Sequence, residues 1–308
     1  MNPSNALIIN DHPRLTVFWK GFKKFWPIYC LVMPAVLWRF IYTIIPLVET
    51  FRLSLTNTSL VNPGRFIGLT NFINLMHDDR FFSTFGVTVY FTITATLLET
   101  ALGLVFALLM TQKLRGQSFF NVALLIPWAV APMLAAQVWR IMFYENAGIL
   151  NEIVKMLGFH FTIPFITDPN MAKVSIVIVT VWKNVSWVTL IFIAGLKGIQ
   201  REIVEAAAVD GANAWQRFRF VTFPLLIPTT VLVLLLRSMG EVQTFEQVYG
   251  LTTGGPGAAT KILALYAFER FFQEFRYGYG ATVNIVLLFI TVAIGGSFAW
   301  RLYRSERM

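Results

Sequence analysis

Two apolar stretches of this 308-residue chain carry polar side chains that recur at helical spacing. Steps of three and four residues place one set on a single helix face: Thr180, Lys183, Asn184 and Trp187. The same steps align a second set: Arg237, Gly240, Glu241 and Thr244. Hydrogen-bonding amides and charges beside an aromatic platform can hold a sugar, which has hydroxyl edges and apolar C–H faces. The two faces are therefore candidate walls of a polar path, with Asn184, Trp187 and Glu241 as its main contacts.

The same residues also allow purely structural interpretations. Arg237 and Glu241 could form an ion pair that only stabilises their helix, and Lys183 could extend towards the membrane surface. Glu99 and Arg39 could pair with each other or with neighbouring subunits. A structural role is favoured for these last two, because their stretches lack a polar stripe.

The elements that position these residues are predicted to be transmembrane helices. Hydrophobic residues make up 56% of the chain and charged residues only 13%, about half the charged share of a soluble domain. A hydrocarbon core needs roughly 20 apolar residues per helix, and the runs are continuous rather than alternating as in a barrel wall. The sequence thus predicts an all-α membrane protein with six spans, at about 28–48, 83–110, 119–139, 174–196, 223–239 and 281–300.

The distribution of Lys and Arg predicts the orientation. With an inside N-terminus, the inside segments hold 13 of these residues in 68 positions, and the outside segments hold 9 in 104. The positive-inside rule then places both termini in the cytoplasm. The expected domains are a cytoplasmic segment 1–27, a membrane domain 28–301 that includes the cytoplasmic loop 197–222, and a cytoplasmic tail 302–308. The net charge of +9 fits this bias and anionic lipid, so no nucleic-acid partner is expected.

The loop 197–222 has an unusual composition for a connection between spans. Three consecutive alanines lie among good helix formers, and Gly211 follows Asp210 where a left-handed helix end favours glycine. The expected structure is a helix, a break, and a second helix that starts near Asn213 and ends at Pro224. Such a segment could insert into a partner's groove or lie on lipid headgroups.

Specific residues of this loop resemble a known signature. Glu205-Ala206-Ala207, Gly211, Val221 and Pro224 resemble the EAA motif of permease subunits of binding-protein-dependent ABC importers, with Val221 and Phe223 in place of the usual isoleucine and leucine. The segments "YGLTTGGPGAAT" and "AGLKGIQREIVEAA" are similar to the maltose-type, sugar-importing branch.

This resemblance implies a type I ABC importer permease fold and a transport subunit that is not an enzyme. It implies that the loop is a coupling helix seated on an ATPase, through Glu205, Ala206, Ala207, Asp210, Gly211, Trp215 and Phe218. The implied partners are a second permease, two copies of a cytoplasmic ATPase and an extracytoplasmic solute-binding protein, all at the cell membrane and surrounded by its lipid. The implied cargo is a di- or oligosaccharide, or a related polyol or glycerol phosphate.

No cofactor is expected in this chain, and ATP and Mg are expected on the partner ATPase. The run "GGPGAATK" does not fit the GxxxxGK[ST] phosphate loop, and His12, His77 and His160 lack metal-ligand spacing. Cys30 is the single cysteine, so no internal disulfide is possible. A secondary carrier driven by an ion gradient is the alternative, with Glu99, Lys183 or Glu241 binding the ion. Such carriers usually show repeated halves, which this sequence lacks. A membrane enzyme would need a catalytic constellation that is not evident.

Overall fold

A computed structural model describes residues 13–112 and 116–305 of the chain. This part is helical apart from its loops and one isolated bridge between Thr56 and Phe66. It divides into two units, residues 1–52 and 53–308. Five helices are long and apolar enough to cross a membrane, and a bent pair makes a sixth candidate. The six predicted spans are thereby found, although one of them is broken.

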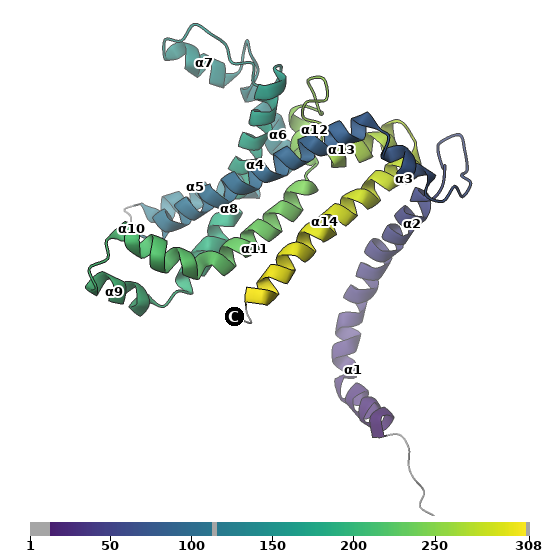
Figure 1. Ribbon diagram of the computed structural model, residues 1–308, viewed down its shortest axis with the longest axis horizontal. Helices are drawn as coiled ribbons and strands as arrows, with labels where there is room; N and C mark the ends of the chain where they lie inside the picture. Colours follow the sequence, from purple (N-terminus) through teal and green to yellow (C-terminus); the bar gives the residue numbers. More distant parts are fainter. Residues whose placement is uncertain (1–12, 113–115, 306–308) are drawn as a thin grey trace, which may run out of the picture. The chain divides into compact units, whose positions relative to one another are not determined.

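The described part of the first unit, residues 13–52, is a single helical segment. It comprises α1 (Pro13–Arg39), the π-helix η1 (Phe40–Ile44) and the start of α2 (Ile45–Ser54), and Figure 1 draws it in purple. The apolar stretch Phe25–Ser54 buries none of its most apolar window within the chain, and Leu31 is 82% exposed. So many apolar side chains do not remain in water, which fits the predicted place of this stretch in the membrane.

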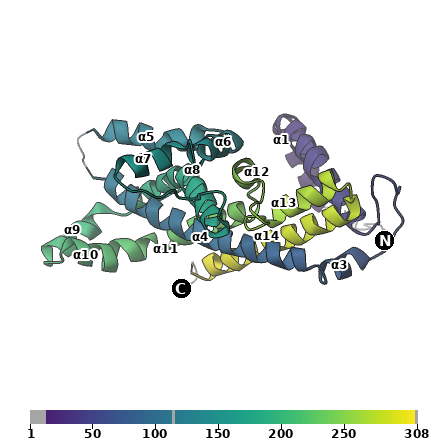
Figure 2. The ribbon, with the colours of Figure 1, turned by 90° about the horizontal axis from the view of Figure 1, so that it is seen from above.

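Four long helices form the second unit: α4 (Asp79–Met110), α8 (Pro169–Lys197), α11 (Phe223–Val242) and α14 (Tyr277–Ser305). The helix α4 packs on α8 and α11, and α11 lies beside α14 (Figures 1 and 2). Shorter elements connect them: α3 (Thr70–Leu75), α7 (Ile149–Met156), α12 (Glu246–Leu251) and α13 (Leu263–Phe268). The predicted spans 83–110, 174–196, 223–239 and 281–300 all lie within the long helices.

Small residues bring α4 and α8 together. Ala95 and Ala107 are fully buried on α4, and Gly103 lies between them on the same face. A Cβ at Gly103 would be only 2.5 Å from Cγ1 of Val188, so no larger residue fits there without a shift. Close backbone approach is how helices associate in lipid, where the hydrophobic effect does not drive them together.

The third predicted span, 119–139, is not one straight helix. It consists of α5 (Gln117–Ala129) and α6 (Pro132–Met142), and Val122–Ala129 and Pro132–Met142 meet at an angle of 104°. Pro127 and Pro132 explain the break, because proline donates no backbone hydrogen bond and its ring clashes with the preceding turn. Carbonyl groups freed in this way must find other donors inside a membrane.

The donors come from α8. The ammonium of Lys183 donates to the carbonyls of Val130, at 2.6 Å, and Trp128, at 3.3 Å, and the hydroxyl of Ser186 donates to the carbonyl of Leu124. The alternative that Lys183 extends to the membrane surface is therefore wrong. Its side chain is 5% exposed and closes the break between α5 and α6.

At the start of α4, a polar cluster connects this helix to the C-terminal part of the chain. Asp78 caps α4 and accepts hydrogen bonds from the hydroxyls of Tyr266 and Tyr279, and Arg270 lies 3.8 Å from it. Burial would raise the pKa of Asp78, but the tyrosine hydrogen bonds, the Arg80 N–H and the Arg270 charge together lower it. Burial and the bond to Asp78 raise the pKa of Tyr266.

The helix α13 is followed by the π-helix η3 (Glu269–Gln273), and both pack on α14.

Candidate functional site

Three charged side chains from two helices meet inside the second unit. Arg237 on α11 donates from Nε to Oε2 of Glu99 at 2.6 Å, and from Nη2 to Oε1 at 3.2 Å. Its Nη2 also donates to Glu241, one turn further along α11. The result is a guanidinium held by two carboxylates, one of which lies 138 residues away in the chain. The i,i+4 pair considered from the sequence does form, but it is only part of the cluster.

Neutral polar and aromatic residues surround this cluster. Asn184 on α8 donates to Oε1 of Glu241 at 3.3 Å, and Thr244 donates to its Oε2 at 3.1 Å. The Arg237 guanidinium carbon lies 5.9 Å from the centre of the Trp187 ring. Three helices thus contribute to one polar centre, which we call the charged centre: Glu99, Asn184, Trp187, Arg237, Glu241 and Thr244.

The charged centre is enclosed. Glu99 is 0% exposed, Glu241 1% and the Arg237 side chain 13%. A buried guanidinium satisfied by two carboxylates avoids the large penalty of an unpaired charge in an apolar environment.

The structure does not bring all the predicted path residues together. Neighbouring positions on a helix differ by about 100° in direction, so Lys183 and Asn184 contact different elements. Thr180 is fully buried, and its hydroxyl has no hydrogen-bond partner among the described residues. Gly240 lies beside the centre, where a Cβ would be 3.6 Å from Nη1 of Arg237. Thr180 and Lys183 therefore lie outside the charged centre, and their part in a path stays a prediction.

Glu99 was missed as a member of the centre. The sequence favoured a structural role and considered Arg39 as its partner, whereas the structure pairs it with Arg237. One signal was available, because Glu99 and Arg237 are opposite charges in two different predicted spans.

The loop 197–222 contains the predicted pair of helices, α9 (Arg201–Val209) and α10 (Ala214–Arg217). Gly211, with φ of +86°, ends α9, since Gly211 N–H donates to Ala208 and Ala212 N–H donates to Ala207. This is the Schellman pattern, which needs the left-handed conformation that glycine adopts freely. As predicted, α10 begins after Asn213, and the structure shows that Asn213 caps it in a reciprocal box with Gln216.

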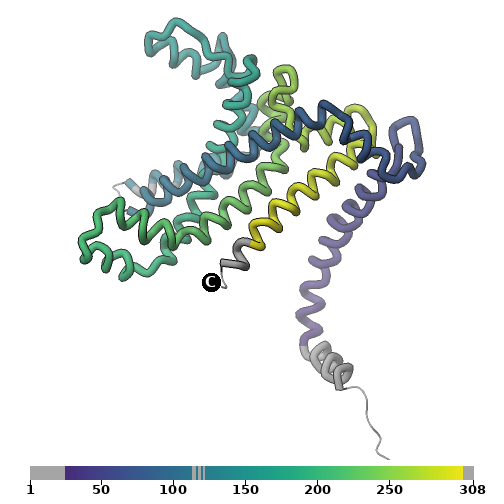
Figure 3. Tube along the Cα trace, viewed as in Figure 1, coloured from purple at the N-terminus to yellow at the C-terminus, as the bar shows by residue number. Residues whose placement is uncertain are grey.

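The second helix of the loop does not end at Pro224. The chain passes from α10 through the π-helix η2 (Phe218–Thr222) directly into α11, a continuous path that Figure 3 traces. The predicted end was wrong because a wide π turn directly precedes Pro224 and relieves the clash of its ring with the preceding turn.

The two loop helices bury no side chain in the described part of the chain. Val209 is 88% exposed and Trp215 is 66% exposed. Ala206 is exposed and Ala207 is half-buried. Asp210 is the C-cap residue of α9, directly before Gly211. Glu205 accepts a hydrogen bond from Arg201 at 2.5 Å. Phe218 is half-buried and stacks near Trp215. The loop is a well-defined structure with an unpacked surface.

Among residues 13–112 and 116–305, no three His, Cys, Asp or Glu side chains are grouped as metal ligands.

Residues 99–302 match the family described as "Binding-protein-dependent transport system inner membrane component". The chain belongs to this family. A probable ABC transporter permease protein of Sinorhizobium fredii is 34% identical over 98% of this chain and 96% of its own length. The trehalose/maltose transport system permease protein MalF of Thermococcus litoralis is 35% identical over 86% of this chain and 89% of its own.

A solved structure shares the fold of this permease. It is a bacterial ABC transporter involved in the import of alginate, with a TM-score of 0.83 and 19% identity over 93% of this chain and 98% of the other. The type I ABC importer permease fold that the resemblance implied is thus found. The permease is a multi-pass component of an importer in the cell membrane, and the alternative of an ion-driven secondary carrier is wrong.

Proposed function

We propose that this permease forms the membrane path for a carbohydrate and is driven by a separate ATPase that holds the loop 197–222. One observation supports the coupling to an ATPase: α9 and α10 have well-defined ends, yet neither helix has a buried side chain. A rigid surface helix pair with exposed Val209 and Trp215 is suited to insertion into a groove of another protein. The contacts come from Glu205, Ala206, Ala207, Asp210, Gly211, Trp215 and Phe218.

The proposed assembly contains a second permease, two copies of the ATPase and an extracytoplasmic solute-binding protein. Both termini and the loop 197–222 face the cytoplasm, in keeping with the density of Lys and Arg in those segments. ATP and Mg bind to the ATPase, and closure of its two copies moves the loop. Rigid-body tilting of the spans then opens the path to alternate sides.

The proposed cargo is a di- or oligosaccharide, or a related polyol or glycerol phosphate. A relative whose name gives trehalose and maltose as cargo is 35% identical, which supports the carbohydrate class. The charged centre offers the amide of Asn184, the carboxylate of Glu241 and the ring of Trp187, which suit hydroxyls and C–H faces. Because the centre is enclosed in this structure, the cargo would reach it in another state of the transport cycle.

The substitution Gly211→Val tests the coupling. Valine at φ +86° is strained, so the end of α9 must change, although a Cβ there meets no other atom. Gly158 is a matched control, since it has φ of +88°, equal open space and a position after α7, away from the loop. A second variant, Glu205→Arg, removes the Arg201 partner without backbone strain.

The measurement is ATP hydrolysis and solute uptake by the reconstituted assembly, together with recovery of the ATPase on the tagged permease. We expect Gly211→Val and Glu205→Arg to insert in the membrane and either release the ATPase or hydrolyse ATP without uptake. Gly158→Val should behave as the wild type. Normal uptake and ATPase recovery in both loop variants would refute the proposal.

A further inference from the structure

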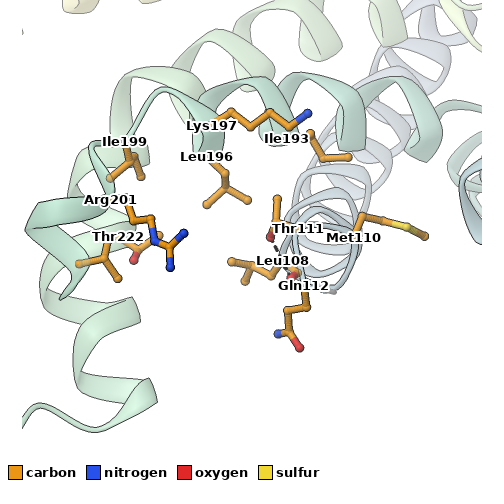
Figure 4. A pocket seen from close by; sticks show the side chains of 11 residues that line it. Leu108, Met110, Thr111, Gln112, Ile193, Leu196, Lys197, Ile199, Arg201 and Thr222 are labelled. Carbon is orange, nitrogen blue, oxygen red and sulfur yellow. Dashed lines mark hydrogen bonds between the residues drawn. The ribbon is translucent and has the colours of Figure 1, made fainter. Parts of the chain in front are cut away.

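A cavity of about 600 Å³ lies where the ends of α4 and α8 meet the start of α9. Figure 4 shows its side chains arranged around an opening, with Leu108 and Leu196 near the middle and the Arg201 guanidinium at one side. The cavity lies next to the loop 197–222 but is separate from the charged centre. Its further lining residues are Met110, Thr111, Gln112, Ile193, Lys197, Ile199, Val204 and Thr222.

The polarity of the lining residues on α4 and α8 depends on how far they lie from the ends of these helices. Thr111 and Gln112 follow the last residue of α4, and Lys197 is the last residue of α8, so these polar groups lie at the ends of two spans. Leu108 and Ile193 lie about one turn inside the same two helices. The lining is therefore polar at the ends of the two spans and aliphatic one turn further inside, and Ile199 and Val204 add aliphatic side chains from the loop 197–222. A soluble polar ligand does not need this gradient, but a lipid does.

The charge of the cavity is positive. Lys197 and Arg201 supply two cations, and none of the described residues that line it is acidic. The helix α9 begins at Arg201, and the Gln200 side chain does not cap it, so first-turn N–H groups add to the positive potential. An anionic group would be held here, whereas a zwitterionic or neutral group would gain little.

We propose that this cavity binds one anionic phospholipid, with the phosphate held by a lining cation, Lys197 or Arg201, in the positive field of both, and an acyl chain along Leu108, Ile193 and Leu196. Thr111, Gln112 and Thr222 can donate hydrogen bonds to the glycerol and headgroup oxygens. The site does not depend on which solute is transported.

Arg201 connects this cavity to the surface of α9. Its Nε is bonded to Glu205, which belongs to the loop proposed to hold the ATPase. A lipid phosphate would compete with Glu205 for the same guanidinium. Occupancy of the cavity would therefore alter the charge that Glu205 presents on the surface of α9.

The test uses the purified full-length chain in mild detergent. Native mass spectrometry would count bound phosphatidylglycerol and phosphatidylcholine with identical acyl chains. The double variant Lys197→Gln/Arg201→Gln removes both cations of the cavity. The control Arg217→Gln/Arg219→Gln removes two positive charges from the same loop, at residues that do not line the cavity.

Each basic residue near a membrane contributes about 1 kcal/mol to the binding of anionic lipid, so two cations correspond to a preference of roughly 30-fold. We expect the wild type and the control to prefer phosphatidylglycerol by this factor, and the cavity variant to show almost no preference. Equal losses in the two double variants, or no preference in the wild type, would overturn the proposal. Retained helical circular dichroism in all variants would establish that they are folded.

Two further experiments distinguish binding of a lipid from binding of a free anion. Leu196→Trp should block lipid binding by filling the cavity while leaving both cations in place. Inorganic phosphate in large excess should not displace phosphatidylglycerol, because it lacks the acyl chain. Displacement by phosphate, or unchanged lipid binding in Leu196→Trp, would show that the cavity is not a lipid site.

Discussion

Arg237 and Glu99 join α11 to α4 through a two-pronged ion pair, with N···O distances of 2.6 and 3.2 Å, inside a segment that crosses the membrane. Glu241 shares the same guanidinium, so one cation faces two carboxylates. Removing Arg237 would leave both carboxylates buried without a cation, so the guanidinium must contribute to holding the two helices together.

We therefore predict that Arg237→Met lowers the free energy of unfolding by about 3–5 kcal/mol, since it leaves two buried carboxylates without a cation. The measurement is thermal unfolding of the purified permease in detergent. Glu49→Gln is the control, because it breaks an exposed ion pair with Arg52 and should change stability by less than about 1 kcal/mol. Similar unfolding temperatures for the two variants would contradict a role of the charged centre in joining the helices.

Lys183→Met is predicted to destabilise the bend between α5 and α6. The carbonyls of Val130 and Trp128 would lose their donor, and a buried unpaired acceptor costs about 1–3 kcal/mol. The change should appear as a lower unfolding temperature and as easier proteolysis at the break. Lys155→Met serves for comparison, since Lys155 lies on the surface and pairs with Glu152 on the same helix. If both variants were equally stable, Lys183 would not be needed to close the break.

Glu241→Ala should change transport without preventing assembly. The substitution removes the acceptor for Asn184 and Thr244, and Arg237 retains Glu99. A hydrogen bond to a charged group contributes about 1.5–3 kcal/mol, so we expect uptake kinetics to change by roughly tenfold or more. The exposed residue Glu246 on α12 provides the control Glu246→Ala. Unchanged uptake in Glu241→Ala would argue that the charged centre is structural only.

The cluster around Asp78 predicts a dependence of stability on pH. Its pKa in the folded protein lies below the ordinary value of 3.8, so its contribution is present above that value and is lost as the pH falls through the folded pKa. Wild-type stability should decline as the pH is lowered from about 5 to 3. Asp78→Asn should be less stable at pH 5 and show a shallower decline, whereas Asp79→Asn, a change at the exposed neighbour, should follow the wild type. Parallel curves for Asp78→Asn and the wild type would exclude Asp78 as the titrating group.

Local sequence was sufficient for the spans and for the loop 197–222. Helix length, capping and chain reversal depend on neighbouring residues, so the Schellman end at Gly211 and the cap at Asn213 could be predicted from residue types alone. The end proposed at Pro224 failed because a π turn before a proline leaves no clear mark in the residue pattern.

Which side chains contact each other between helices was decided by the tertiary structure. Periodicity placed Lys183 and Asn184 on one broad face, but only packing decided that Lys183 reaches the broken helix and Asn184 reaches Glu241. The Glu99 and Arg237 pair likewise joins residues 138 positions apart. The sequence by itself determined the class of protein, its helices and its surface loop, since these follow from short-range chemistry. The charged centre and the cavity at the ends of α4 and α8 were decided by the tertiary structure, because they exist only where separate helices come into contact.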